Sequence, residues 1–173
     1  MKRKIVWATG LLGLGIAGLI AFDRFRCAEH MYSYYPVYAD AVADGALNRG
    51  WVPSIIPASA TEIHEEHDLD TNQVWIRFRM PPIDRAGLTS GMRQLSNQEV
   101  QALRVRQACT GDWWFEGLIE QQPANDAALN AEIYVGTLSS LGWPHFVAIQ
   151  RAGSLVYYWS DPGRESGVNM DGR

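Results

Sequence analysis

Residues 74–80 read Val-Trp-Ile-Arg-Phe-Arg-Met, and this stretch decides the fold class. Its even-numbered positions are all apolar, while its odd-numbered positions hold one tryptophan and two arginines. Strict alternation of this kind predicts a β-strand whose even-numbered side chains face the core. Pro81 and Pro82 follow at once and end the strand, because proline cannot donate a hydrogen bond to a sheet ladder.

Further strands are predicted downstream. Residues 131–138 form a strand-length apolar segment, and residues 145–150 and 155–159 are expected to pair as a hairpin around a short turn. The apolar run at 113–119 also has the length of a strand. These segments follow one another through short connections, which favours antiparallel pairing.

Three helices are predicted from their end signals. The first spans residues 36–49, with Pro36 in its first turn and Gly50 as a left-handed terminator. The second spans 59–67 and the third 96–108, and each begins with a Ser-x-x-Glu capping box. The predicted order is therefore helix, short helix, strand, helix and then four strands.

This order predicts the α+β class. We expect an N-terminal transmembrane helix followed by one domain, in which two to three helices pack on an antiparallel sheet of about five strands. The chain divides into four expected regions: an anchor (1–22), a juxtamembrane segment (23–35), a single α+β domain (36–162) and a flexible tail (163–173).

The expected anchor is an uncharged run at residues 5–22, preceded by three basic residues at 2–4. A helix of that length is about 27 Å long, close to the hydrocarbon thickness of a bilayer. The alternative is a cleaved signal peptide, but a cut after Ala21 would put Leu19 at a position that requires a small residue. The basic flank predicts a single-pass protein of the inner (cytoplasmic) membrane, with its C-terminal domain in the periplasm.

Composition excludes one class of partner. After the anchor the chain carries twelve Lys or Arg and nineteen Asp or Glu, so this part has a net charge near −7. A domain this acidic is not suited to nucleic acid. Seven Trp, seven Tyr and five Phe are a large aromatic content, and most of these rings are expected in the core.

Two cysteines, Cys27 and Cys109, are present. An even number of cysteines in an oxidising compartment favours a disulfide, which would tie the juxtamembrane segment to the domain. Closing a loop of about 80 residues would contribute roughly 4 kcal/mol by chain entropy. The alternative is two independent thiols.

A metal site is one hypothesis for the segment from His64 to Asp70. On a helix, His64 and His67 would share a face, and with Asp68 and Asp70 they would supply imidazole and carboxylate ligands. The Asp68-x-Asp70-x-Asn72 spacing is also how calcium loops begin, but it lacks the glycine and the final glutamate of an EF-hand. The alternative is a polar helix end leading into an Asx turn.

No catalytic pattern is recognisable. The sequence has neither a G-x-S-x-G elbow nor an S-x-x-K pair, and phosphate-binding glycine patterns are missing. We therefore expect a non-enzymatic protein with no catalytic residues and no cofactor.

Four residues are candidates for contact with a protein partner: Trp75, Arg77, Arg79 and Trp143. Trp and Arg are enriched in binding hot spots. The first three lie on the outward face of their predicted strand, and Trp143 lies in a loop between turn-forming residues. The alternative is that a helix covers Trp75 and that Trp143 fills the end of the sheet.

Residues 51–64 follow the pattern W-x-P-x-x-x-P-x-S-A-T-x-I-H, and residues 68–72 follow D-x-D-T-N. With these features the segment from about 45 to 80 resembles a group of uncharacterised, membrane-anchored bacterial proteins. The resemblance implies a bacterial envelope protein and brings no known activity or site residue.

The function expected from these features is a membrane-anchored periplasmic domain that binds another envelope protein, with inhibitors and immunity proteins as one variant. The alternative is an envelope sensor that binds a metal or small ligand through the segment from His64 to Asp70.

Overall fold

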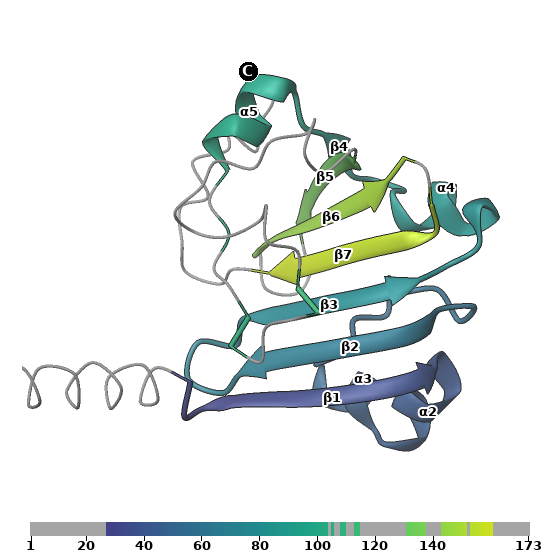
Figure 1. The fold of residues 1–173 in the computed structure, drawn as a ribbon, viewed down its shortest axis with the longest axis vertical. Helices are drawn as coiled ribbons and strands as arrows, with labels where there is room; N and C mark the ends of the chain where they lie inside the picture. The colour runs from purple at the N-terminus through teal and green to yellow at the C-terminus, as the bar shows by residue number, and fades with distance from the viewer. Residues whose placement is uncertain are drawn as a thin grey trace, which may run out of the picture. The chain divides into compact units, whose positions relative to one another are not determined.

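The computed structural model describes residues 27–103, 105, 108–109, 113–114, 131–137, 143–151 and 153–160 (Figure 1). The described residues form a seven-stranded sheet with the strand order β1-β2-β3-β7-β6-β5-β4. The pairs β2–β3, β3–β7, β7–β6, β6–β5 and β5–β4 are all antiparallel. β1 is one edge strand of this sheet and the short β4 is the other.

The strands are β1 (His30–Val37), β2 (Thr61–Asp68), β3 (Val74–Arg79), β4 (Arg93–Gln94), β5 (Ala131–Thr137), β6 (Pro144–Gln150) and β7 (Leu155–Ser160). The helices are α2 (Tyr38–Ala43), α3 (Ala46–Arg49), η1 (Pro82–Asp84), α4 (Arg85–Leu88) and α5 (Asn97–Ala102). The described part of the chain is therefore mostly antiparallel sheet with a few short helices, and the expected α+β domain with about five strands and two to three packed helices is wrong.

The largest error concerns residues 59–67, which were expected to form a helix and instead lead into β2. The Ser59-x-x-Glu62 pattern does not cap a helix, because the Glu62 carboxylate binds Arg79 on the neighbouring strand, 2.8 Å away. The backbone of Glu62 has a positive φ of 50°, and the register between β2 and β3 shifts at this point, between Thr61 and His64. From Ile63 onward β2 alternates, but its core-facing positions include Glu65 and His67, which hides the apolar pattern of a strand.

The N-terminal part of the domain also differs from expectation. β1 begins within the expected juxtamembrane segment and continues through Pro36, where the first helix was expected to start. The predicted helix over 36–49 is two short helices, because Gly45 between them has a φ of 78°. Gly50 does terminate the second of these helices in the left-handed conformation, as predicted.

Several predicted elements are confirmed. The alternating stretch forms β3, the segment after residue 130 forms β5, and β6 and β7 pair as an antiparallel hairpin. The Ser96–Glu99 capping box is present at the start of α5, although this helix ends at Ala102 rather than Ala108.

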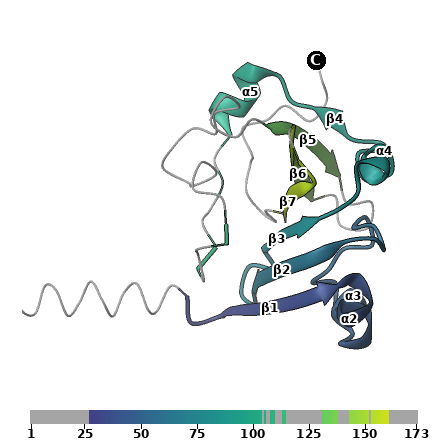
Figure 2. The ribbon, with the colours of Figure 1, turned by 45° about the vertical axis from the view of Figure 1, so that its right-hand side comes forward.

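Helices lie on both faces of the sheet, and each face carries a hydrophobic core (Figure 2). On one face, α2, α3 and α4 contribute to a core built on the even-numbered side chains of β3. On the other face, Val100 of α5 and the tryptophans Trp113 and Trp114 pack with Trp75 of β3. The even-numbered residues of β3 therefore face a core, as predicted, and the odd-numbered Trp75 faces a second core.

The chain divides into two compact units, Met1–His30 and Met31–Arg173. Among the residues that the structure describes, no helix has the length and hydrophobicity needed to cross a bilayer. The predicted anchor at 1–22 and the predicted tail at 163–173 lie outside the described residues, as does most of the apolar run at 113–119.

Candidate functional site

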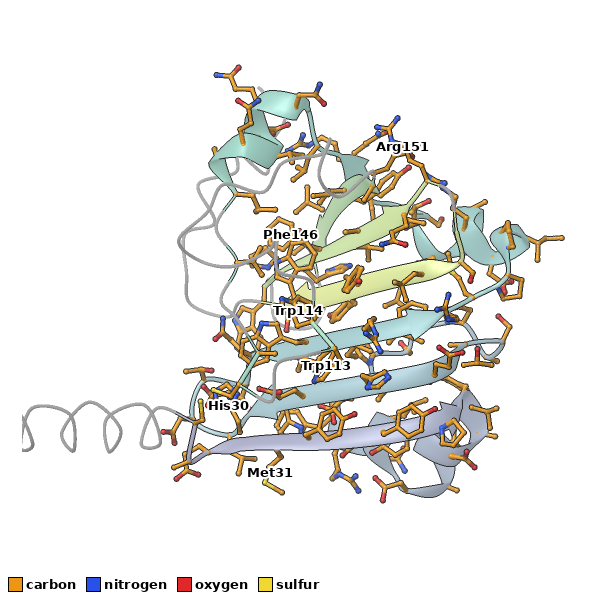
Figure 3. All side chains as sticks on the ribbon, in the orientation of Figure 1. His30, Met31, Trp113, Trp114, Phe146 and Arg151 are labelled. Carbon is orange, nitrogen blue, oxygen red and sulfur yellow. The ribbon has the colours of Figure 1, made fainter. Side chains whose placement is uncertain are left out.

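The most exposed apolar side chains of the sheet are gathered on β1. Met31, Tyr32, Tyr34 and Val37 are between 40% and 51% exposed. β1 has one neighbouring strand, β2, and no other described strand pairs with its outer edge. Edge strands offer unpaired backbone groups to other chains, and natural proteins usually protect them with charge. The exposed positions of β1 carry apolar and aromatic side chains instead, among them Met31 (Figure 3).

Alternation along β1 separates its side chains into two sets. Tyr35 points into the core on the helix-covered face, where its hydroxyl donates to Asp44 Oδ2 at 2.8 Å. Tyr32 and Tyr34 lie on the opposite face, beside His64 of the adjacent strand. We call Tyr32, Tyr34 and His64 the Tyr–His patch.

His64 is the centre of this patch. Its Nδ1 lies 2.8 Å from the hydroxyl oxygen of Tyr32, and its Nε2 lies 2.8 Å from Nη2 of Arg77. Because a guanidinium can only donate, Nε2 must accept, and the ring proton of the neutral imidazole sits on Nδ1. The Nδ1–H group therefore donates to the oxygen of Tyr32. This arrangement fixes both the tautomer of His64 and the position of the Tyr32 ring.

The charge state of His64 follows from its surroundings. Burial and then the positive charge of Arg77 lower the pKa of His64 below its ordinary value. Protonation would place an imidazolium against a guanidinium and remove the acceptor at Nε2. The patch is therefore built around a neutral histidine.

A buried aromatic layer supports the patch. The Trp113 ring stacks on His64 with a centroid separation of 5.8 Å and an interplanar angle of 17°. Arg77 donates from Nη1 to the Trp113 carbonyl oxygen at 2.7 Å, so one guanidinium holds both the imidazole and the tryptophan backbone. Trp114, labelled with Trp113 in Figure 3, packs edge-on against Tyr157, with 5.6 Å between ring centroids. The exposed tyrosines thus rest on a rigid base.

The predicted metal ligands are not brought together. His64 and His67 are three apart on a strand, so they lie on opposite faces of the sheet. His67 Nδ1 is 2.7 Å from Glu65 Oε1, and its ring stacks on Trp51 at 3.8 Å between centroids. The helix on which the two histidines were expected to share a face is therefore a strand, and that premise of the metal hypothesis is wrong.

Asp68 has a role in the turn between β2 and β3. Its Oδ1 accepts from the backbone N–H of Asp70 at 2.8 Å and of Thr71 at 3.2 Å. These bonds form the Asx turn that was the alternative interpretation of the Asp68-x-Asp70-x-Asn72 spacing. Asn72, with a φ of 57°, follows in the left-handed region that asparagine tolerates.

Glu65 is a feature that the sequence interpretation missed. Its side chain is 1% exposed, and burial together with the charge of Glu66 raises its pKa to about 8. No sequence pattern indicated that this carboxyl is buried beside a histidine, because the segment was expected to form a helix with a polar surface. Its hydrogen bond to His67 compensates for part of the cost of burial.

The candidate partner-binding residues fall in three environments. Trp75 is only 2% exposed, since the second core covers it. Arg77 is half-buried beneath the Tyr–His patch. Arg79 is exposed and forms an ion pair with Glu62, while Trp143 is half-buried just before β6. Alternation alone could not indicate exposure here, because each face of the sheet carries a core.

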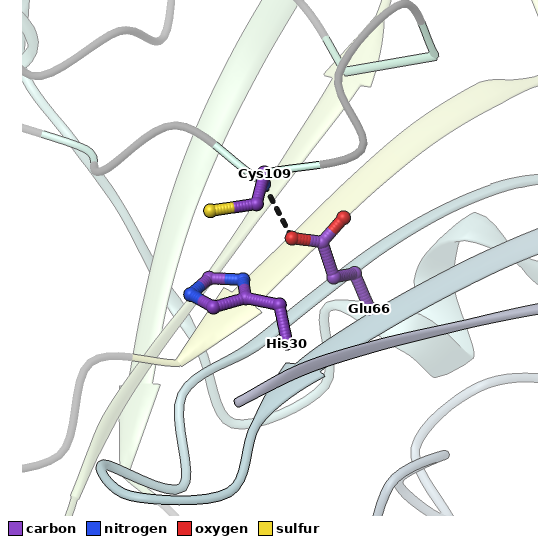
Figure 4. Close-up of side chains that lie close together, drawn as sticks. All are labelled: His30, Glu66 and Cys109. Atoms are coloured by element: carbon purple, nitrogen blue, oxygen red, sulfur yellow. Dashed lines mark hydrogen bonds between the residues drawn. The ribbon is translucent and has the colours of Figure 1, made fainter. Parts of the chain in front are cut away.

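Cys27 and Cys109 are both disulfide-bonded, and the chain has no other cysteine, so the predicted bridge is confirmed. The Cys109 sulfur is consequently not available as a thiolate. The backbone N–H of Cys109 donates to Oε1 of Glu66, a side chain that is fully buried (Figure 4). Glu66 thereby ties the backbone at residue 109 to β2.

A family model matches the N-terminal strands of the described sheet. Residues 29–79 match the family model described as the YbbD head domain, which indicates a bacterial family. The match covers β1, β2 and β3, and it therefore includes every residue of the Tyr–His patch. No curated protein matches the chain, and no solved structure does.

Proposed function

We propose that this chain is a non-enzymatic, membrane-anchored domain of the bacterial envelope that binds another envelope protein through β1. The observation that carries the proposal is the Tyr–His patch. It presents two tyrosines, 40% and 48% exposed, on an edge strand whose outer edge pairs with no described strand. Tyrosine is favoured at protein interfaces because it combines a large apolar ring with a polar tip.

The rigidity of the patch supports a role in recognition. Tyr32 is held by His64, which is held in turn by Arg77 and by stacking on Trp113. A side chain that is already ordered loses less conformational entropy when a partner binds. Met31 and Val37 are exposed apolar side chains of the same strand, and they lie on the face opposite to Tyr32 and Tyr34.

Three features support the envelope location. The disulfide fits an oxidising compartment such as the periplasm. The uncharged run at residues 5–22 has the length of a membrane anchor, and its basic flank favours a cytoplasmic N-terminus. The family match at residues 29–79 agrees with a bacterial origin. An inhibitor or immunity protein against an envelope-active toxin is one form that this function can take.

Affinity capture of the full chain from solubilised membranes tests this function. The wild type is expected to retain a specific envelope protein, and the double variant Tyr32→Ala/Tyr34→Ala is expected to lose it. Ile83→Ala is the matched control, because Ile83 is 86% exposed and lies in η1, outside the patch. Retention of the same protein by the double variant would contradict the assignment to β1. Absence of any specific partner, together with turnover of a substrate, would overturn the function itself.

A further inference from the structure

A cavity of about 390 Å³ is lined by residues of η1, α4 and β6, by the residue that follows β3 and by the connection between β6 and β7. It is lined by Met80, Pro82, Arg85, Ile149, Arg151, Gly153 and Ser154. Its volume is in the range of small-molecule sites. None of these residues belongs to the Tyr–His patch, so the cavity is independent of the function proposed above.

The cavity combines an apolar floor with two arginines. Met80 and Ile149 are buried core residues, 3% and 2% exposed, and they give the cavity an apolar base. Arg85 and Arg151 supply the positive charge, from α4 and from the end of β6 (Figure 3 labels Arg151). A site of this kind favours a ligand with a short apolar part and an anionic end.

The two arginines differ in how far their charge is compensated. Nη2 of Arg85 donates to the Glu132 carboxylate, and Tyr134 lies beside this pair. Arg151 is exposed and makes no hydrogen bond or ion pair with the described residues, although its charge acts on Glu132 from a distance. Among the described residues, one carboxylate therefore faces two guanidinium groups, which leaves about one positive charge uncompensated at the rim.

We propose that this cavity binds a carboxylate carried on a short apolar chain. A planar guanidinium pairs with a carboxylate through two parallel hydrogen bonds, and none of the described residues occupies the donors of Arg151. A single uncompensated cation matches a monoanion, and the floor of Met80 and Ile149 matches the apolar chain. The same chemistry occurs in a free small carboxylic acid and at the C-terminus of a protein chain.

The probe is hexanoate, titrated into the full chain in lipid nanodiscs, with empty nanodiscs as the blank. We expect saturable binding of hexanoate and at least about tenfold weaker binding of hexanol, which lacks the charge, and of acetate, which lacks the chain. Arg151→Gln should weaken hexanoate binding about tenfold, and Arg151→Lys should restore part of the loss. Arg49→Gln is the matched control, since Arg49 is equally a surface arginine but lies in α3.

A peptide arm distinguishes the two sources of the carboxylate. The tripeptide acetyl-Ala-Val-Leu is compared with its C-terminal amide. Tighter binding of the acid than of hexanoate, with no binding of the amide, supports a protein C-terminus as the ligand. Binding of hexanoate without binding of the tripeptide acid supports a small acid. Equal hexanoate affinity in the wild type and in Arg151→Gln, or equal affinity for hexanoate and hexanol, overturns the proposal.

Discussion

His64 and Arg77 face one another across β2 and β3, with Nη2 of Arg77 2.8 Å from Nε2 of His64. This contact between two potentially cationic side chains is favourable only when the imidazole is neutral. It orients His64 toward Tyr32, and the second Arg77 donor binds the Trp113 carbonyl. A half-buried arginine thus orders the exposed surface of the edge strand.

Replacing Arg77 should therefore destabilise the domain. Arg77→Met removes two charge-assisted hydrogen bonds and leaves the Trp113 carbonyl oxygen without this donor, so we expect a loss of about 2–3 kcal/mol in the free energy of unfolding. The measurement is urea denaturation of the purified protein. Arg79→Met is the control, because Arg79 forms an exposed ion pair with Glu62 and should cost at most about 1 kcal/mol. Equal effects of the two substitutions would contradict the role of Arg77.

Acidification should weaken the fold through His64. The pKa of His64 is lowered in the folded protein, so the unfolded chain binds the proton more readily. Stability from this group is fully present above the unfolded pKa of about 6.5 and decreases as the pH falls through that value toward the lowered folded pKa. Burial lowers the pKa of His145 as well, and this group acts in the same direction.

The measurement is the free energy of unfolding between pH 7.5 and 5 for the wild type and for His64→Gln. The variant should show a smaller decrease on acidification than the wild type. A histidine NMR titration gives the folded pKa directly. A His64 pKa at or above the ordinary value would contradict a neutral patch.

Glu65 should produce the opposite pH dependence. Burial and the charge of Glu66 raise the Glu65 pKa to about 8, so ionisation is less favourable in the folded protein than in the unfolded chain. Stability from this group is present below the unfolded pKa of about 4.3 and is lost as the pH rises from there through the folded pKa. Glu65→Gln removes the titration and keeps a hydrogen-bond donor for His67.

We therefore expect Glu65→Gln to gain stability relative to the wild type as the pH is raised from 6 to 9, as measured by thermal unfolding. Glu62→Gln is the control, because Glu62 lies on the same strand but is exposed and pairs with Arg79 at the surface. A wild-type profile parallel to that of Glu65→Gln across this range would show that Glu65 does not titrate there.

The disulfide should contribute much of the stability. Breaking the bridge between Cys27 and Cys109 frees a loop of about 80 residues in the unfolded chain, and the double variant Cys27→Ser/Cys109→Ser should lose roughly 4 kcal/mol. The measurement is denaturation with and without a reductant. The reductant should destabilise the wild type and leave the double variant unchanged. Equal stability of oxidised and reduced wild type would contradict this account.

The sequence predicted those strands whose apolar residues alternate in the usual way. β3 and the β6–β7 hairpin are examples. β2 was missed because Glu65 and His67 occupy core-facing positions and because a capping-box pattern precedes it. β1 was missed because Pro36 suggested a helix start, whereas an edge strand tolerates proline.

The Tyr–His patch could not be predicted because it depends on which strands are neighbours. Tyr32 and His64 are 32 residues apart, and only the pairing of β1 with β2 brings them together. The same topology places a second layer over Trp75, so this candidate for partner contact is buried. Local patterns indicate which residues share a face, and long-range packing decides whether that face meets solvent.

Site-specific photo-cross-linking in living cells tests the central claim most directly. A benzophenone amino acid is placed at position 34 of the full chain, and at position 83 as the exposed control. The account predicts one cross-linked product at position 34 that contains an envelope protein, that disappears when Tyr32→Ala is added, and that is absent at position 83. No product at position 34, or the same product at both positions, would contradict a partner-binding surface on β1.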